Sequence, residues 1–211
     1  MGTMKRGVGW IAAGAAAVLV AAGAVTYAVA AGDDPSIEAP AKDSADAGFA
    51  RDMSIHHQQA VEMSYIVRDR TDDEDVRRLA YDIAQTQANQ RGMMLGWLDL
   101  WSLPKASADP PMTWMGMGDM PAGEDGALMP GMATDAEMEK LGRLNGKQAE
   151  IFYLQLMTAH HKGGIHMAEG CESKCTVGAA KRLAGTMVQG QESEIQLMAD
   201  MLEERGATAR P

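Results

Sequence analysis

Hydrophobic positions recur at helical spacing in two long stretches of the chain, near residues 49–67 and 153–171. Within each stretch, the inward positions step by four and three residues, which places them on one face of an α-helix. These positions are Phe49, Met53, His56, Ala60, Met63 and Val67 in the first stretch, and Tyr153, Met157, His160, Gly164, Met167 and Cys171 in the second. Each stretch is therefore predicted to be a helix that packs one face against partner helices.

The two stretches belong to an internal repeat with an offset of 104 residues. Aligning residues 53–98 with residues 157–202 gives eleven identical pairs without a gap. The pairs include Met53–Met157, His56–His160, His57–His161, Met63–Met167, Gln87–Gln191 and Met94–Met198. An internal repeat indicates a fold built from two copies of one unit.

Each copy is typical of a hairpin of two helices. The predicted helices span about 46–70, 73–101, 135–170 and 177–205. Four such helices form an all-α, antiparallel four-helix bundle, here predicted over residues 46–206, with hairpin one at 46–101 and hairpin two at 135–206. Gly163 and Gly164 weaken the third helix and leave room for close approach by another helix or a ligand.

Residues 102–134 connect the two hairpins and contain five of the eight prolines and six methionines. So much Pro and Gly predicts a mobile crossover loop rather than a helix. Met112, Met115, Met117 and Met120 are spaced by 3, 2 and 3 residues. Their thioethers form either a separate binding site for a soft metal ion such as Cu(I) or an incidental set that lies on the bundle.

The N-terminus is apolar and follows two basic residues. Lys5 and Arg6 precede 26 uncharged residues, Gly7–Gly32, which is enough for a bilayer span of about 20 residues. The Ala28–Val29–Ala30 sequence is also typical of signal-peptide cleavage. Residues 1–32 are predicted to be a membrane anchor or a signal peptide and residues 33–45 a polar spacer, with the bundle on the extracytoplasmic side or secreted.

Composition changes this picture in two ways. There are eighteen methionines but only two phenylalanines, and a core of Met and Ala favours helices. The formal net charge of −10 disfavours nucleic acid as a partner and favours metal cations.

All five histidines lie in the two repeated motifs, at positions 56, 57, 160, 161 and 166. Polar groups on the inward faces need either a hydrogen-bond network or a bound ion, because unpaired burial is unfavourable. A packed core layer of His, Gln and Met is one interpretation, and a metal site is the one favoured here. The predicted metal ligands are Met53, His56, His57, Met63, Met94, Met157, His160, His161, His166, Met167 and Met198, with Gln87, Gln191 and Glu194 around them.

Thioether and imidazole together favour copper, Cu(I) in particular, since Met sulfur suits soft ions. Zinc sites prefer His, Cys or carboxylate ligands. A di-iron bundle needs about four inward Glu residues and a Glu-x-x-His pattern, which neither repeat has.

The two cysteines lie four residues apart in the sequence GCESKC. In an exported protein, Cys171 and Cys175 are typical of a short disulfide. A pair of soft-metal ligands is the alternative.

The stretches FARDMSIHHQQAVEMS and FYLQLMTAHHKGGIHMAE resemble the domain of unknown function 305 family. The resemblance covers about residues 46–205 and implies a ferritin-like four-helix bundle, with copper binding in some members. It points to the two Met and two His residues of each motif. The family's second helix tends to end Gln-x-x-Glu-Ile-x-x-Met; Gln191 to Met198 match this pattern, whereas Gln90 and Arg91 depart from it.

The sequence therefore predicts an extracytoplasmic copper-binding protein that serves as buffer, chaperone or resistance factor, with a copper-delivery partner or a second copy as possible partners. No nucleophile–base pair or phosphate loop is visible in the sequence, so enzyme activity is not predicted. A metal-dependent oxidase and a metal-free envelope scaffold are the alternatives.

Overall fold

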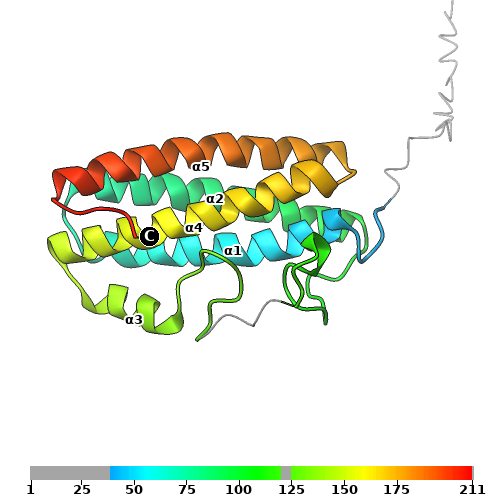
Figure 1. The fold of residues 1–211 in the computed structure, drawn as a ribbon, viewed down its shortest axis with the longest axis horizontal. Helices are drawn as coiled ribbons and strands as arrows, with labels where there is room; N and C mark the ends of the chain where they lie inside the picture. Colours follow the sequence, from blue (N-terminus) through cyan, green and yellow to red (C-terminus); the bar gives the residue numbers. More distant parts are fainter. Residues whose placement is uncertain (1–38, 120–124, 211) are drawn as a thin grey trace, which may run out of the picture. The chain divides into compact units, whose positions relative to one another are not determined.

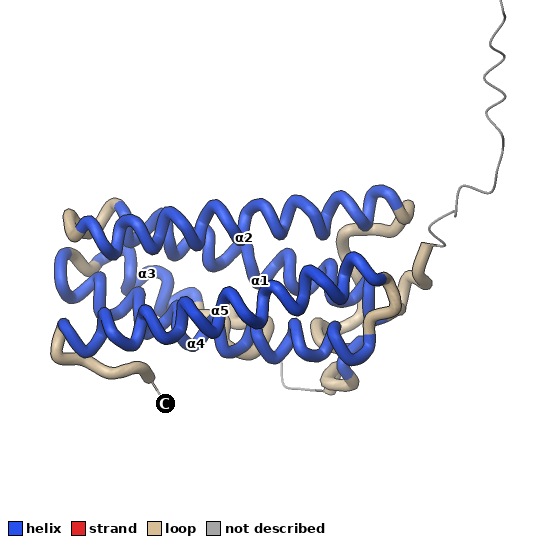
Figure 2. The backbone as a smooth tube through the Cα atoms, turned by 90° about the horizontal axis from the view of Figure 1, so that it is seen from above, coloured by secondary structure: helices blue, strands red, loops and turns tan. Residues whose placement is uncertain are grey.

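The computed structural model describes residues 39–119 and 125–210, and the predicted N-terminal helix, residues 1–32, lies outside this range. The described residues form five α-helices and one short 3₁₀ helix, without a strand. The helices are α1 (Ala45–Arg68), α2 (Glu74–Leu100), α3 (Asp135–Arg143), α4 (Gly146–Lys174) and α5 (Gly178–Glu204), with η1 (Thr113–Met115) in the connection. Figures 1 and 2 show the four long helices with their axes aligned lengthwise.

Helix starts follow from local capping residues. The side chains of Ser44 and Asp73 accept hydrogen bonds from backbone N–H groups in the first turns of α1 and α2, which satisfies donors that a helix start leaves free. Thr134 and Glu137 form a reciprocal capping box at the start of α3.

The predicted third helix, 135–170, is in fact two helices, with a break at Leu144 and Asn145. Both residues have extended backbones. Gly146 has a φ of +52°, and its N–H donates to the Arg70 carbonyl in the α1–α2 turn. The chain reverses here, so that α3 lies against α1 below the bundle in Figure 1, and α4 extends four residues beyond the predicted end.

Packing is strongest within the hairpins α1–α2 and α4–α5 and between α1 and α4. At one end of the bundle, the Asp46 carboxylate on α1 accepts hydrogen bonds from the N–H groups of Thr176 and Val177 in the α4–α5 turn. These bonds cap the start of α5, where no local side chain does so. They also show that α1 and α4 are antiparallel.

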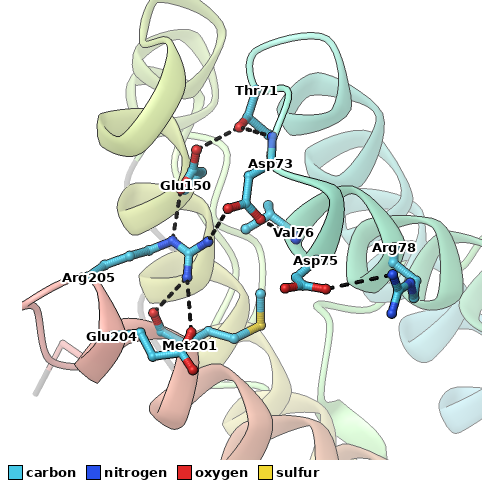
Figure 3. Close-up of polar contacts among 9 residues, drawn as sticks. All are labelled: Thr71, Asp73, Asp75, Val76, Arg78, Glu150, Met201, Glu204 and Arg205. Carbon is cyan, nitrogen blue, oxygen red and sulfur yellow. Dashed lines mark hydrogen bonds and ion pairs between the residues drawn. The ribbon is translucent and has the colours of Figure 1, made fainter.

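The opposite end of the bundle repeats this arrangement. Glu150 lies 104 residues after Asp46, and its carboxylate accepts from the Thr71 hydroxyl in the α1–α2 turn at 2.6 Å. The same carboxylate pairs with Arg205, which also pairs with Asp73 at 2.9 Å (Figure 3). Each hairpin therefore begins with an acid that holds the turn of the other hairpin.

Candidate metal centre

Four histidines from α1 and α4 meet in the middle of the bundle and form what we term the histidine layer: His56, His57, His160 and His161. All four side chains are fully buried. The rings of His56 and His160 stack with centroids 3.7 Å apart and planes tilted by 34°. The inward faces predicted by the 3–4 spacing thus bring the two repeated motifs into direct contact.

Each histidine directs its Nε2 atom at an oxygen. His160 Nε2–H donates to the His56 carbonyl at 2.9 Å, and His56 Nε2 lies 3.3 Å from the Pro130 carbonyl. His57 donates to Gln90 Oε1 at 2.8 Å, and His161 donates to Glu194 Oε2 at 2.6 Å. Because carbonyl and carboxylate oxygens only accept, these partners place a proton on Nε2, and in a neutral ring the lone pair then lies on Nδ1.

The Nδ1 atoms of all four rings are buried without a hydrogen-bond partner in the described residues. The amide oxygens of Gln87 and Gln191 are buried and unpartnered as well. Against these six acceptors stands one unpartnered donor group, the Gln87 Nε2 amide. Such an excess of buried lone pairs is unfavourable unless water or a cation occupies the layer.

Burial also keeps the imidazoles neutral. Loss of hydration lowers the pKa of His56 to about 3 and that of His57 to about 4, from an ordinary value of 6.5. The pKa of His160 is well below 6.5, again through burial first and then through the adjacent His56 ring. These three rings therefore present lone pairs rather than charges at neutral pH.

Six of the predicted methionine ligands lie in two buried apolar clusters. Met63, Met157 and Met198 belong to one cluster, and Met53, Met94 and Met167 belong to the other. The 104-residue offset exchanges the two sets, so the approximate two-fold axis of the repeat relates one cluster to the other. The side chains of all six are fully buried.

The connecting chain covers the α1–α4 side of the histidine layer. Gln59 on α1 donates to the Ala133 carbonyl and accepts from the Ala133 N–H, at 2.8 and 2.7 Å. A Cβ at Gly163 would collide with the Pro130 carbonyl oxygen, so glycine is needed for this approach. At Gly164, a Cβ would lie 2.5 Å from Gln191 Oε1. The predicted Gly163–Gly164 pair thus admits both the loop and an amide.

The first part of the crossover connection is packed on the bundle, contrary to the predicted mobile loop. Asp52 on α1 accepts from the Met112 N–H at 2.8 Å and from Trp114 Nε1–H at 2.9 Å. Burial raises the pKa of Asp52, while these two bonds oppose the rise. A Cβ at Gly48 would lie 2.5 Å from the Trp114 ring, so that ring rests directly on α1.

The described methionines of the connection accordingly lie on the bundle instead of forming a separate exposed group. Met112 is buried, and Met115 and Met117 are half-buried beside the same apolar cluster. The Met115 side chain packs against Gly170 of α4. Met120 lies outside the described residues.

His166 is exposed, so it does not join the other predicted ligands in the interior of the bundle. It lies six residues after His160, which turns its side chain away from the face that carries His160, Gly164 and Met167. At the 104-residue offset it corresponds to Glu62, another exposed position.

Cys171 and Cys175 form a disulfide across the last turn of α4. Both cysteines are buried in the cluster that contains Met53, Met94 and Met167. The disulfide adjoins Thr176, the residue that Asp46 holds.

Two absences apply to residues 39–119 and 125–210. No three or more His, Cys, Asp or Glu side chains in these ranges converge in a geometry that could hold a metal ion. Within the same ranges, no helix combines the length and apolar character required to span a bilayer.

Sequence reasoning missed several residues that build this centre or hold the ends of the bundle. Gln59, Pro130 and Ala133 lie in or against a connection that resembles linker in composition. The acids Asp46 and Glu150 lie outside the strict run of identities, although the 104-residue offset pairs them. A search of the repeat for similar rather than identical residues would have found that pair.

Together, these features define an all-α bundle of two duplicated hairpins around a buried layer of four histidines. Residues 46–202 match the family described as domain of unknown function DUF305. The chain belongs to this family.

Solved structures agree with the fold. A DUF305 protein from Streptomyces coelicolor, provisionally described as secreted, is 75% identical, with a TM-score of 0.76 over 81% of this chain and 99% of its own. A DUF305 fragment from Deinococcus radiodurans is 29% identical, with a TM-score of 0.62 over 76% and 96%.

CopM in its Cu(I)-bound form shares the fold at 18% identity, with a TM-score of 0.58 over 75% of this chain and 96% of its own. CopM has also been solved with Cu(II) and with silver. A comparison with curated proteins returns no significant match.

Proposed function

We propose that the histidine layer binds copper, with Cu(I) preferred, and that the protein buffers, carries or sequesters copper outside the cytoplasm. The observation that carries this proposal is the set of four buried Nδ1 atoms without hydrogen-bond partners. Metal-binding imidazoles commonly donate their other N–H to a carbonyl or carboxylate, which fixes the tautomer and the ring orientation. All four rings of the layer make that outer contact through Nε2.

The residues present suit Cu(I) better than harder ions. His56, His57 and His160 are held neutral. Six buried methionines belong to the two apolar clusters described above, which contain residues within a turn or two of these histidines on α1 and α4. Thioether and imidazole ligands favour Cu(I), whereas Mg²⁺ and Ca²⁺ prefer oxygen ligands. The copper-bound and silver-bound CopM structures, which share this fold, support testing these two ions first.

An extracytoplasmic location is part of the proposal. The disulfide Cys171–Cys175 is typical of proteins in an oxidising compartment. The Streptomyces coelicolor relative is provisionally described as secreted. The apolar N-terminal segment would serve as the anchor or signal peptide that places the bundle there.

Competition between the purified protein and a chromogenic Cu(I) chelator tests the proposal. Replacing His56, His57, His160 and His161 by Ala should lower the Cu(I) affinity by more than about 100-fold, since loss of the ligands exceeds the usual effect of losing their outer partners. His166→Ala on the same helix is the matched control and should bind as the wild type does. Wild-type affinity in the quadruple variant, with helicity retained by circular dichroism, would show that the layer is only core packing.

A further inference from the structure

We propose that the cleft between α2 and α5 is the port through which the ion enters and leaves the histidine layer; this inference rests on the proposed copper binding. The cleft has a volume of about 70 Å³, and one water needs about 10–15 Å³. It therefore accommodates several waters or a partly hydrated ion. Its walls are Thr86, Gln87 and Gln90 on α2, and Thr186, Met187, Gly190, Gln191 and Glu194 on α5.

The cleft exists because α2 and α5 do not form a close pair among the described helices. The close pairs are α1–α2, α4–α5 and α1–α4. The second helices of the two hairpins thus face each other across the bundle without the interdigitated packing that seals the other sides. Apart from Met187, small or polar residues line this side, and Gly190 has open space where a Cβ would stand.

Two unpartnered side chains line this cleft from opposite walls. Gln87 is 2% exposed and Gln191 is 5% exposed, yet Gln87 lacks partners for both amide atoms and Gln191 lacks one for its oxygen. Buried amides in natural proteins are normally paired. In this cleft they supply oxygens that replace the water ligands of an entering cation.

The next residues along the walls lead directly to the histidines. Gln90 accepts the His57 Nε2–H, and Glu194 accepts the His161 Nε2–H. Glu194 is 26% exposed, so its carboxylate contacts both solvent and the layer. A negative charge at the mouth of a narrow cleft raises the local concentration of cations. Met187, also on this wall, is a buried thioether.

The opposite side of the layer is closed. Two hydrogen bonds hold Ala133 to Gln59, and the Pro130 carbonyl lies against Gly163 and His56. Entry there would require the connection to detach from both α1 and α4. The α2–α5 side requires only side-chain motion, which is far faster than local unfolding.

Gly190→Trp tests the port by placing a large ring across its mouth. The substitution fits the open space at Gly190 and improves the helix propensity of α5, so folding is not expected to suffer. We expect the rate of Cu(I) transfer from a chromogenic chelator, measured by stopped-flow absorbance, to fall by about tenfold or more, because entry then needs local opening. The equilibrium affinity for Cu(I) should stay within about twofold, since no ligand is changed.

Gly92→Trp is the matched control. Gly92 also has open space around its missing Cβ, lies on the α2 wall helix, and does not line the cleft. It should load at the wild-type rate. Thr86→Trp closes the cleft from the α2 wall and should reproduce the slow loading of Gly190→Trp.

The outcomes separate the port from the site. Wild-type loading rates in both Gly190→Trp and Thr86→Trp, with Cu(I) affinity intact, would refute the port. The proposal that the histidine layer binds copper would be unaffected. A large loss of equilibrium affinity in both variants would also refute the port, because the cleft would then be part of the site. Absence of Cu(I) binding by the wild-type protein would instead overturn the proposed function.

Discussion

The two hairpins bring the same histidine pair to the layer but support it differently. His57 donates to the neutral amide of Gln90, whereas His161, its counterpart, donates to the carboxylate of Glu194. A carboxylate partner makes the imidazole a more basic metal ligand and adds negative charge beside a bound cation. The difference teaches that one repeated unit can yield two unlike half-sites through a single change at the outer contact.

The stacked pair in the centre is also asymmetric. His160 donates to the carbonyl of His56, but His56 turns to Pro130 in the crossover connection rather than to His160. Only one such connection exists between the two hairpins, so it can cover only one half of the layer. The connection thus breaks the symmetry of the repeat at the histidines.

Acid should unfold the apo protein and so remove both half-sites. In the folded state the pKa values of His56, His57 and His160 lie below 6.5, the value for an exposed His. Between pH 6.5 and about 4, the unfolded chain binds protons that the folded layer excludes. The free energy of unfolding should therefore fall with decreasing pH, with a contribution from these three residues of at most about 4 kcal/mol per pH unit.

Urea unfolding at a series of pH values measures this slope. The quadruple His→Ala variant lacks the titrating groups and should show a much flatter dependence. An apo wild type with constant stability from pH 6.5 to 4 would contradict the burial of neutral imidazoles.

The two end contacts should differ in strength. Removing Glu150 leaves the buried Arg205 guanidinium with less compensation, so Glu150→Ala should destabilise the protein by about 3 kcal/mol. Asp46→Ala loses hydrogen bonds but leaves no buried cation without a partner, so we expect it to destabilise the protein by about 2 kcal/mol. Thermal and urea unfolding give both values.

Glu139→Ala is the control for the end contacts, because its ion pair with Arg143 is exposed on both sides. Its effect should be below about 0.5 kcal/mol. Equal, small effects for all three variants would show that the acids at the two ends do not hold the hairpins together.

Changing either outer contact to match the other should remove the difference between the half-sites and change the copper affinity in opposite directions. Glu194→Gln should lower copper affinity by about tenfold, and Gln90→Glu should raise it by about tenfold, because the carboxylate is lost or gained beside the imidazole. The effect should be larger for Cu(II) than for Cu(I), since the charge acts on a divalent ion more strongly. Competition titrations with chelators for each oxidation state provide the test, and unchanged affinities in both variants would refute unequal half-sites.

The sequence predicted the layer because repetition and 3–4 spacing both act through helix geometry. Met53, His56 and Met63 are inward for the same reason as Met157, His160 and Met167. His166 is close to His160 in sequence, but the six intervening helical steps turn its side chain away from the inward face. The break before Gly146 depends on a hydrogen bond to Arg70, a distant contact that no local pattern displays.

The role of the crossover connection was also beyond local pattern. Its Pro and Gly content indicates an irregular chain, which it is, but does not reveal whether it packs. Packing depends on Asp52, Gly48 and Gln59 of α1, each of which looks like an ordinary helix residue until the partner is in place. Long-range partners of single polar residues thus account for most of what the sequence left open.

Nitrogen NMR of ¹⁵N-labelled histidines, recorded while the protein is loaded with Cu(I), tests the central claim most directly. In the apo layer, the Nδ1 atoms of His56, His57, His160 and His161 have no hydrogen-bond partner and are the proposed ligand atoms. We expect Nδ1 signals within this set to shift on loading, while Nε2 stays protonated and His166 does not change. Shifts confined to Nε2 or to His166, or no shift at all with copper bound, would contradict the assignment of the histidine layer as the metal centre.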